Sequence, residues 1–240
     1  MKLRLDRALV ERGLAPTREK AQALIMAGEV LLDGRKAAKS GQPVDSGSRV
    51  EVLAQPPFVS RGGLKLDRAI AHFGIPVAGR VCLDIGASTG GFTDCLLQRG
   101  AARVHSVDVG VGQLDWKIRS DPRVVLHEKL NARYLRPEDL GEPIGLVVCD
   151  VSFISVTLIV PAVSEVLHPA GEMVILVKPQ FEVGKGQVGK GGIVRDPELH
   201  QAACRRVDDA VRLLGFVTAL IESPILGTEG NREFLLHGHR

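Results

Sequence analysis

Four polar residues stand beside apolar segments, where their side chains could meet in one site. They are Lys65 at the start of LKLDRAIAHF, Asp150 at the end of GLVVCD, Lys178 at the end of MVILVK and Glu233 after GTEGNR. Each one alone is more often a solvated end of a strand or helix. As a set, two lysines and two carboxylates can neutralise one another in a partly buried site, where a lysine can serve as a general base. The residue types therefore indicate proton-transfer chemistry.

A glycine-rich turn within residues 81–94, VCLDIGASTGGFTD, predicts a site for a nucleotide-like ligand. The segment combines a strand, a turn and a helix start, and Gly86, Gly90 and Gly91 let the backbone approach a ligand closely. Ser88 takes the place of the middle glycine of G-x-G-x-x-G, so the dinucleotide fingerprint is broken, and no Gly-Lys-Ser/Thr follows. A ligand without a pyrophosphate, such as S-adenosylmethionine (SAM), does not need that glycine.

Two aspartates are predicted to belong to the same site. Asp84 stands where the first strand runs out, and Asp108 ends the next strand-like segment, RVHSVDV, about 20 residues beyond the turn. A carboxylate at that distance suits ribose hydroxyls, whether the ligand is a dinucleotide or SAM. An ordinary tight strand-to-helix turn is the alternative reading of the glycines.

Composition indicates a globular protein without a membrane span. The chain has 240 residues, of which 45% are apolar and 25% charged, enough for one large domain with or without a small one. The opening MKLRLDRALVERG is charged throughout, so we do not expect a signal peptide. The longest uncharged apolar-rich run, residues 151–164, is short of the ~20 residues that a spanning helix needs. We expect a cytoplasmic protein with no membrane partner.

The four cysteines do not predict a metal site. Cys82, Cys95, Cys149 and Cys204 are scattered without C-x-x-C spacing, and three of them lie in or beside predicted core elements. Reduced, buried thiols are the expected state, and no metal is predicted.

The excess positive charge lies in the first quarter of the chain. Residues 1–60 hold ten Lys and Arg against seven Asp and Glu, whereas the rest holds 21 of each. A solvated face could explain so small an excess, but its confinement to one segment favours a polyanion-binding module. The basic side chains suited to phosphate contacts are Arg4, Arg7, Arg12, Arg18, Lys20, Arg35 and Lys36.

That first segment is predicted to be a small α/β domain. The spacing of apolar residues predicts a helix that ends near Gly13, and Thr17 is the expected N-cap of a second helix over residues 18–26. Strands are expected at 30–32 and 49–53, with an Asp33-Gly34 turn between them. The paired prolines of QPPF then mark a boundary. We therefore predict domains at 1–56 and 57–240.

The second domain is predicted to be a doubly covered, mainly parallel sheet. Strand signals at 81–85, 104–109, 124–127, 145–149 and 173–177 alternate with helical stretches. Asp196-Pro197 should cap a helix to about residue 214, before a final pair of strands at 216–222 and 233–237. A closing antiparallel strand is typical of a SAM-dependent methyltransferase, so the fold class is α/β with a Rossmann-like, seven-stranded sheet.

Two resemblances make these predictions specific. The run LDRALVERGLAPTREKAQALIMAGEVLLDGR resembles the S4 RNA-binding domain, which implies a structured RNA, and ribosomal RNA in particular, as partner. Residues 59–240 resemble the FtsJ-type ribose 2'-O-methyltransferases in VSRGGLKL, LDIGASTGGFTDCLL, VVCDVSFIS, VKPQFEVGKGQVGKGGIVRD and GNREFLL. The whole chain is similar to the TlyA family of S4-plus-FtsJ rRNA methyltransferases, also called hemolysin A.

The resemblance implies roles for individual residues. It assigns a catalytic tetrad to Lys65, Asp150, Lys178 and Glu233, with Lys178 as the base that activates a ribose 2'-hydroxyl. Asn131 departs from the aspartate that relatives often carry at the adenine edge, although an asparagine can still hydrogen-bond adenine. The expected SAM contacts are Asp84, Gly86, Ala87, Ser88, Gly90, Gly91, Phe92, Asp108, Asn131 and Asp150.

Substrate contacts are expected outside the tetrad as well. The Gly/Lys-rich loop at residues 179–192 is either a flexible connector or a lid that closes on RNA phosphates, and Arg61, Lys185 and Lys190 are predicted to bind RNA. Phe58, Phe153 and Phe181 could stack a flipped base or belong to the core.

Three other functions stay open at this point. They are a SAM-dependent methyltransferase with a non-RNA substrate, a non-catalytic ribosome-assembly factor that binds RNA and retains SAM, and a membrane-lytic protein, which the hemolysin name alone suggests. The family resemblance favours cytidine in ribosomal RNA or ribosomal subunits. The sequence does not decide the oligomeric state, although a monomer is favoured.

Overall fold

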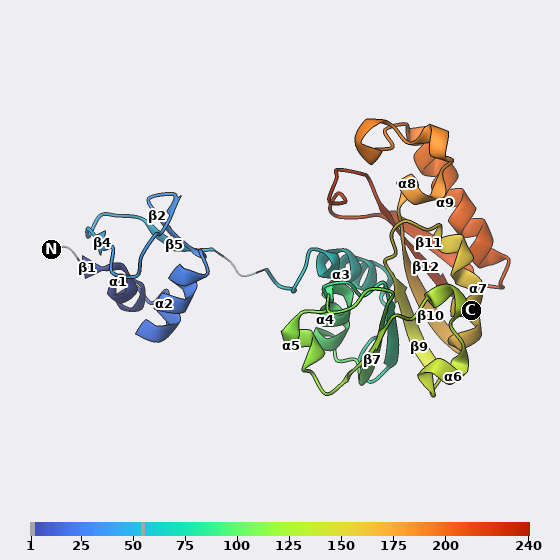
Figure 1. Ribbon diagram of the computed structural model, residues 1–240, viewed down its shortest axis with the longest axis horizontal. Coiled ribbons are helices and arrows are strands. Elements are labelled where there is room, and N and C mark those ends of the chain that lie inside the picture. Colours follow the sequence, from blue (N-terminus) through green and yellow to red (C-terminus); the bar gives the residue numbers. More distant parts are fainter. Residues whose placement is uncertain (1–2, 54–55) are drawn as a thin grey trace. The chain divides into compact units, whose positions relative to one another are not determined.

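The computed structural model describes residues 3–53 and 56–240, except the side chain of Lys185. The chain divides into two compact units, Met1–Pro56 and Pro57–Arg240 (Figure 1).

The first unit packs two helices against short antiparallel strands. Leu5, Leu9, Leu24, Ile25 and Val30 are buried in its core. Strand order is β3-β2-β5 in one small sheet and β1-β4 in another. The elements are β1 (Leu3–Arg4), α1 (Leu5–Glu11), α2 (Arg18–Met26), β2 (Val30–Leu32), β3 (Arg35–Lys36), β4 (Pro43–Val44) and β5 (Val50–Val52).

Local signals explain the second helix and the turn of this unit. The side chain of Thr17 accepts a hydrogen bond from the backbone N–H of Lys20 and caps α2, as predicted. Asp33 and Gly34 both have positive φ, which a tight two-residue hairpin turn requires. The turn leads directly into β3, while β5 pairs with the other side of β2.

The second unit is a seven-stranded sheet with the order β11-β12-β10-β9-β6-β7-β8. β12 runs antiparallel to both of its neighbours, whereas β10, β9, β6, β7 and β8 pair with one another in parallel. This arrangement confirms the predicted fold class. The strands are β6 (Val81–Ile85), β7 (Arg103–Asp108), β8 (Val124–Glu128), β9 (Ile144–Cys149), β10 (Leu167–Val177), β11 (Val217–Glu222) and β12 (Phe234–His239).

Helices cover both faces of this sheet (Figure 1). In β9, Val147 and Cys149 pack into the core shared with α7 and α9, whereas Leu146 and Val148 pack into the core shared with α3 and α4. Burial on both faces explains why the strands read as continuous apolar runs. The α-helices are α3 (Gly62–Phe73), α4 (Gly91–Gln98), α5 (Trp116–Arg119), α6 (Pro137–Leu140), α7 (Val160–Val166), α8 (Pro179–Glu182) and α9 (Pro197–Arg212).

Candidate active site

Strand register brings three of the four predicted catalytic residues to one edge of the sheet. Asp150 follows β9 and Lys178 follows β10, and these neighbouring strands are parallel, so both residues leave the sheet at the same edge. Because β12 is antiparallel, its first residue pairs with the last residue of β10, Phe234 opposite Val177. Glu233, immediately before β12, therefore reaches the same edge.

Lys65 completes the group from the first turn of α3. Its Nζ lies 2.6 Å from Oε2 of Glu233, and the two side chains are only 10% and 3% exposed. The Nζ of Lys178 lies 2.6 Å from Oδ1 of Asp150 and donates a 2.9 Å hydrogen bond to Oγ of Ser152. Each lysine thus has its own carboxylate.

All four side chains line one cavity of about 510 Å³. Its other walls come from the segment before α3, the glycine turn, the loop after β9, and the 179–192 and 227–233 segments. The lining includes Ser60, Arg61, Ser88, Phe92, Phe153, Phe181, Thr228 and Glu229. Segments far apart in the sequence therefore enclose the ion pairs.

Two glycines let the turn approach neighbouring segments closely. A Cβ on Gly86 would lie 2.2 Å from the backbone oxygen of Asp150, and φ there is +80°. A Cβ on Gly91 would lie 2.1 Å from Oγ of Ser60. The two glycines let the turn contact the Asp150 loop and the segment before α3, so they shape the cavity.

A second cavity of about 470 Å³ adjoins the first and shares Gly86, Ser88, Ser152 and Phe153 with it. Asp108 lines it, and its carboxylate accepts hydrogen bonds from the backbone N–H of Ser88 and of Gly110 at 2.8 and 2.7 Å. A carboxylate has about four acceptor positions, so two remain for a ribose.

Asn131 also lines the second cavity. Its Oδ1 accepts a hydrogen bond from the backbone N–H of Arg133, which leaves an adenine contact to Nδ2. The cavity's remaining walls are mainly apolar, from Ile85, Val107, Leu130 and Ile159 among others. Such walls with polar groups at the rim fit a nucleoside.

Eight of the ten predicted SAM contacts line one of these cavities, and Asp84 and Gly90 are not among the described lining residues. Gly90, with φ +94°, makes room for Leu114, whose Cδ1 would lie 2.8 Å from a Cβ at that position. Asp84 is fully buried and accepts a 2.6 Å hydrogen bond from Oγ1 of Thr93. Asp84 and Gly90 therefore support the turn from the side that packs into the protein.

Asp84 makes stability depend on pH. Burial raises the pKa of Asp84 from 3.8 to about 7, with the hydrogen bond from Thr93 opposing and the charge of Asp150 adding to the shift. The folded state thus keeps a proton that the unfolded state loses, so this contribution to stability falls as pH rises from about 4 to about 7. The side chain of Asn in Asp84→Asn cannot ionise. The free energy of unfolding of the variant, measured in urea, minus that of the wild type should therefore be larger at pH 8 than at pH 5. An equal difference at both pH values would contradict the assignment.

The three candidate stacking phenylalanines have different positions. Phe58 is buried and packs against Gly63 in the core. Phe153 is 92% exposed, has a left-handed φ of +66°, and lies with its ring centroid 5.4 Å from that of Phe181. Both of these rings line the larger cavity, so they are the pair available to a base.

Glu182, a buried residue that was not predicted, links the two segments that carry these rings. Glu182 of α8 accepts hydrogen bonds from Oγ of Ser155 at 2.5 Å and from the backbone N–H of Val156 at 2.8 Å. It thereby ties the segment after Phe153 to the helix that carries Phe181. Glu182 does not line either cavity, but polar lining residues that were not predicted include Thr89, Gln113, Ser152, Gln180, Thr228 and Glu229. The SF pair after VVCDV is a sequence signal for Ser152, and the polarity of GTEGNR is one for Thr228 and Glu229.

The basic residues of the first unit are exposed, but several are held by neighbours. Arg4 and Arg18 both contact the buried carboxylate of Asp6, and the Arg4 hydrogen bond leads the interactions that hold the pKa of Asp6 well below its usual range. Arg12 donates to the backbone oxygen of Ser48 at 2.6 Å. The remaining exposed members are Arg7, Lys20, Arg35 and Lys36.

Two of the predicted RNA contacts near the cavity are described. Arg61 lines the cavity and donates a 3.1 Å hydrogen bond to Oγ1 of Thr228. Lys190 is exposed. The side chain of Lys185 lies outside the described part of the chain. The loop that carries both lysines contains short helical turns at Lys185–Gln187 and Lys190–Gly192.

Comparison with known proteins decides the family. Residues 58–240 match the model of the FtsJ-like methyltransferases, and residues 3–50 match that of the S4 domain. The 16S/23S rRNA (cytidine-2'-O)-methyltransferase TlyA of Mycobacterium tuberculosis is 48% identical over 236 residues, which are 97% of this chain and 88% of the relative. The chain belongs to the TlyA family. This confirms the membership that the sequence motifs indicated.

Solved structures agree with the TlyA fold. A protein of Lactococcus lactis named as a hemolysin is 49% identical to this TlyA-family chain, and its structure matches with a TM-score of 0.75. The match covers 77% of this chain and 89% of the Lactococcus chain. An S-adenosylmethionine-dependent methyltransferase of Listeria monocytogenes shares the fold at 14% identity and a TM-score of 0.55, over 75% of this chain and all of its own. Among the described helices, none is both long and apolar enough to cross a membrane.

Proposed function

We propose that this TlyA-family protein transfers a methyl group from SAM to a ribose 2'-hydroxyl of ribosomal RNA, at a cytidine. The observation that carries the proposal is the meeting of two lysine–carboxylate pairs in a cavity that adjoins a second, nucleoside-sized one. The mycobacterial relative's name specifies this reaction. A protein that modifies ribosomal RNA works where ribosomes are, so we also propose a cytoplasmic location.

The smaller cavity fits the nucleoside half of SAM. Asp108 would accept hydrogen bonds from the ribose hydroxyls, and Asn131 would contact adenine through Nδ2. Gly86 lies close to the backbone of Asp150, and the turn lines the larger cavity beyond it. The amino-acid half of SAM would lie there, beside Ala87 and Gly91. When bound, SAM supplies an electrophilic methyl group on a positively charged sulfur.

Lys178 would be the general base for the attacking hydroxyl. Nζ of Lys178, once it has released its own proton to solvent, would take the proton of the 2'-hydroxyl as that oxygen receives the methyl group. The 2.6 Å contact with Asp150 and the 2.9 Å hydrogen bond to Ser152 fix the direction of Nζ. Fixing the base and the acceptor in one geometry contributes much of the acceleration.

Lys65 and Glu233 would position the ribose beside this base. Their contact is more buried than that of Lys178 with Asp150, so the pair forms a rigid wall of the cavity. The exposed ring of Phe153 and its neighbour Phe181 would stack the target base. The basic side chains of the S4 domain would bind RNA phosphates.

Methyl transfer to isolated ribosomal subunits tests the proposal. Small and large subunits are incubated separately with the protein and with SAM labelled in the methyl group, and the RNA is digested to nucleosides for mass spectrometry. We expect label in 2'-O-methylcytidine. Label in protein or in small molecules, with none in RNA, would overturn the proposal.

A further inference from the structure

An exposed aromatic ledge lies beside the two cavities, and the function described above gives no role to its tryptophan. The Trp116 ledge, as we call residues 109–119, presents Val109, Val111 and Trp116 with 67%, 57% and 77% of their surfaces exposed. The side chain of Lys117 is 68% exposed. Trp116 is the only tryptophan of the chain. Burial therefore does not explain a large aromatic side chain at this position.

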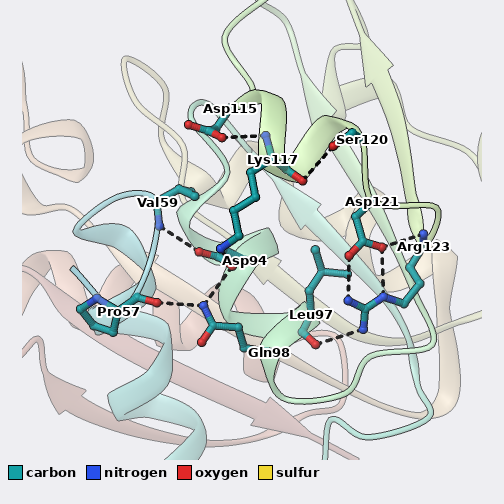
Figure 2. Close-up of polar contacts among 10 residues, drawn as sticks. All are labelled: Pro57, Val59, Asp94, Leu97, Gln98, Asp115, Lys117, Ser120, Asp121 and Arg123. Atoms are coloured by element: carbon teal, nitrogen blue, oxygen red, sulfur yellow. Dashed lines mark hydrogen bonds and ion pairs between the residues drawn. The ribbon is translucent and has the colours of Figure 1, made fainter. Parts of the chain in front are cut away.

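Hydrogen bonds hold the Trp116 end of the ledge, residues 115–119, in place (Figure 2). The carboxylate of Asp115 accepts a 2.8 Å hydrogen bond from the backbone N–H of Lys117, and the hydroxyl of Ser120 donates to the backbone oxygen of Lys117. The Nζ of Lys117 also lies 3.6 Å from a carboxylate oxygen of Asp94 in α4. A fixed backbone means that a ligand would not have to order the Trp116 ledge on binding.

The Trp116 ledge contacts the walls of both cavities. Val109 and Gln113 line the smaller cavity. The backbone N–H of Asp115 donates to the oxygen of Thr89, which lines the larger one. Leu114 packs against Gly90 of the glycine turn. A molecule that reaches into the larger cavity would therefore have this exposed surface next to it.

Charge favours a polyanion as the occupant. Residues 109–136 hold six Lys and Arg against three Asp and Glu, although residues 61–240 as a whole hold 21 of each. Within this segment the η1 turn (Ala132–Tyr134) follows Asn131, which lines the smaller cavity. There Arg133 lies over the exposed ring of Tyr134, 5.7 Å from its centroid. Exposed aromatic rings interleaved with cations are what single-stranded RNA binds.

We propose that the Trp116 ledge is a stacking platform for an unpaired RNA base that flanks the methylated nucleotide. This rests on the proposed function, because it needs RNA as the substrate. Trp116 would stack on the base, and the exposed Lys117 would contact a phosphate. Stacking tolerates any base, so the platform would strengthen RNA binding without choosing the sequence.

The single tryptophan allows a direct test in the unmodified protein. Protein-free ribosomal RNA contains no tryptophan, so emission excited near 295 nm comes from Trp116 alone. We expect RNA to quench this emission and to protect it from acrylamide, whereas SAM alone should do neither. RNA binding shown by filter retention without a change in emission would overturn the proposal, as would an equal response to SAM alone.

A substitution series separates this inference from the proposed function. Stacking energies predict that Trp116→Ala raises the KM for ribosomal subunits about 5- to 100-fold, with kcat, SAM affinity and melting temperature nearly unchanged. Trp116→Phe should recover most of the loss. Leu213→Ala is the matched control, because Leu213 is 86% exposed at the end of α9 and lines neither cavity among the described residues. Normal KM in Trp116→Ala overturns the platform alone, whereas absence of RNA methylation in the wild type overturns the proposed function.

Discussion

Replacing Lys178 with alanine should lower the rate of methyl transfer by about 10²- to 10⁴-fold, the usual contribution of a general base. The substitution removes Nζ from its contacts with Asp150 and Ser152 but leaves the smaller cavity intact, because Lys178 does not line it among the described residues. SAM affinity should therefore stay close to that of the wild type. Single-turnover kinetics with ribosomal subunits and calorimetric titration with SAM measure the two effects.

Lys178→Arg distinguishes a base from a positive charge. Arginine keeps the charge beside Asp150, but it does not give up its proton in proteins. If Lys178 acts as the base, Lys178→Arg should be nearly as slow as Lys178→Ala. Arg205→Ala, which changes an exposed arginine of α9, is the control for loss of a charge. Full activity in Lys178→Ala would rule out Lys178 as the base.

Glu233→Ala should be the second large effect, and it should act on folding as well as on activity. The substitution leaves Lys65 buried without the carboxylate that is 2.6 Å away. Removing one partner of a buried ion pair typically costs about 3–5 kcal/mol. We therefore expect a clear fall in the free energy of unfolding, measured by urea denaturation, together with loss of methylation.

Removing both charges separates these two consequences. Lys65→Met combined with Glu233→Met keeps a similar volume without an uncompensated charge, so most of the stability should return while activity stays lost. Glu222→Gln is the matched control, since Glu222 pairs with Arg232 where both side chains are about half exposed, and such pairs contribute about 0–1 kcal/mol. Equal losses of stability in Glu222→Gln and Glu233→Ala would contradict the argument from burial.

Much of the fold could be predicted because its signals are local. Thr17 caps α2, Asp196 caps α9, and β6 occupies the predicted residues 81–85. Strand direction alone predicts at which edge of the sheet Asp150 and Lys178 lie. Parallel pairing then makes the two residues neighbours.

The features that could not be predicted depend on contacts between residues that are far apart in the sequence. β10 begins at Leu167 rather than at residue 173, because Leu167 pairs with Ile144 across an irregularity despite the intervening Pro169 and Gly171. Asp84 belongs to a buried network with Thr93 and Ser106, which strand periodicity alone could not distinguish from a ligand contact. Glu182 accepts a hydrogen bond from Val156, which lies 26 residues earlier in the chain, so no regular spacing of residues could indicate this contact.

The two cavities share four lining residues, and this has a consequence for inhibitor design. Gly86, Ser88, Ser152 and Phe153 border both spaces, so a single molecule could place one nucleoside-like group in each. Joining the two groups makes the second binding event intramolecular, and the effective concentration set by a short linker is in the millimolar range. The best linker would be the one whose length matches the passage beside Phe153.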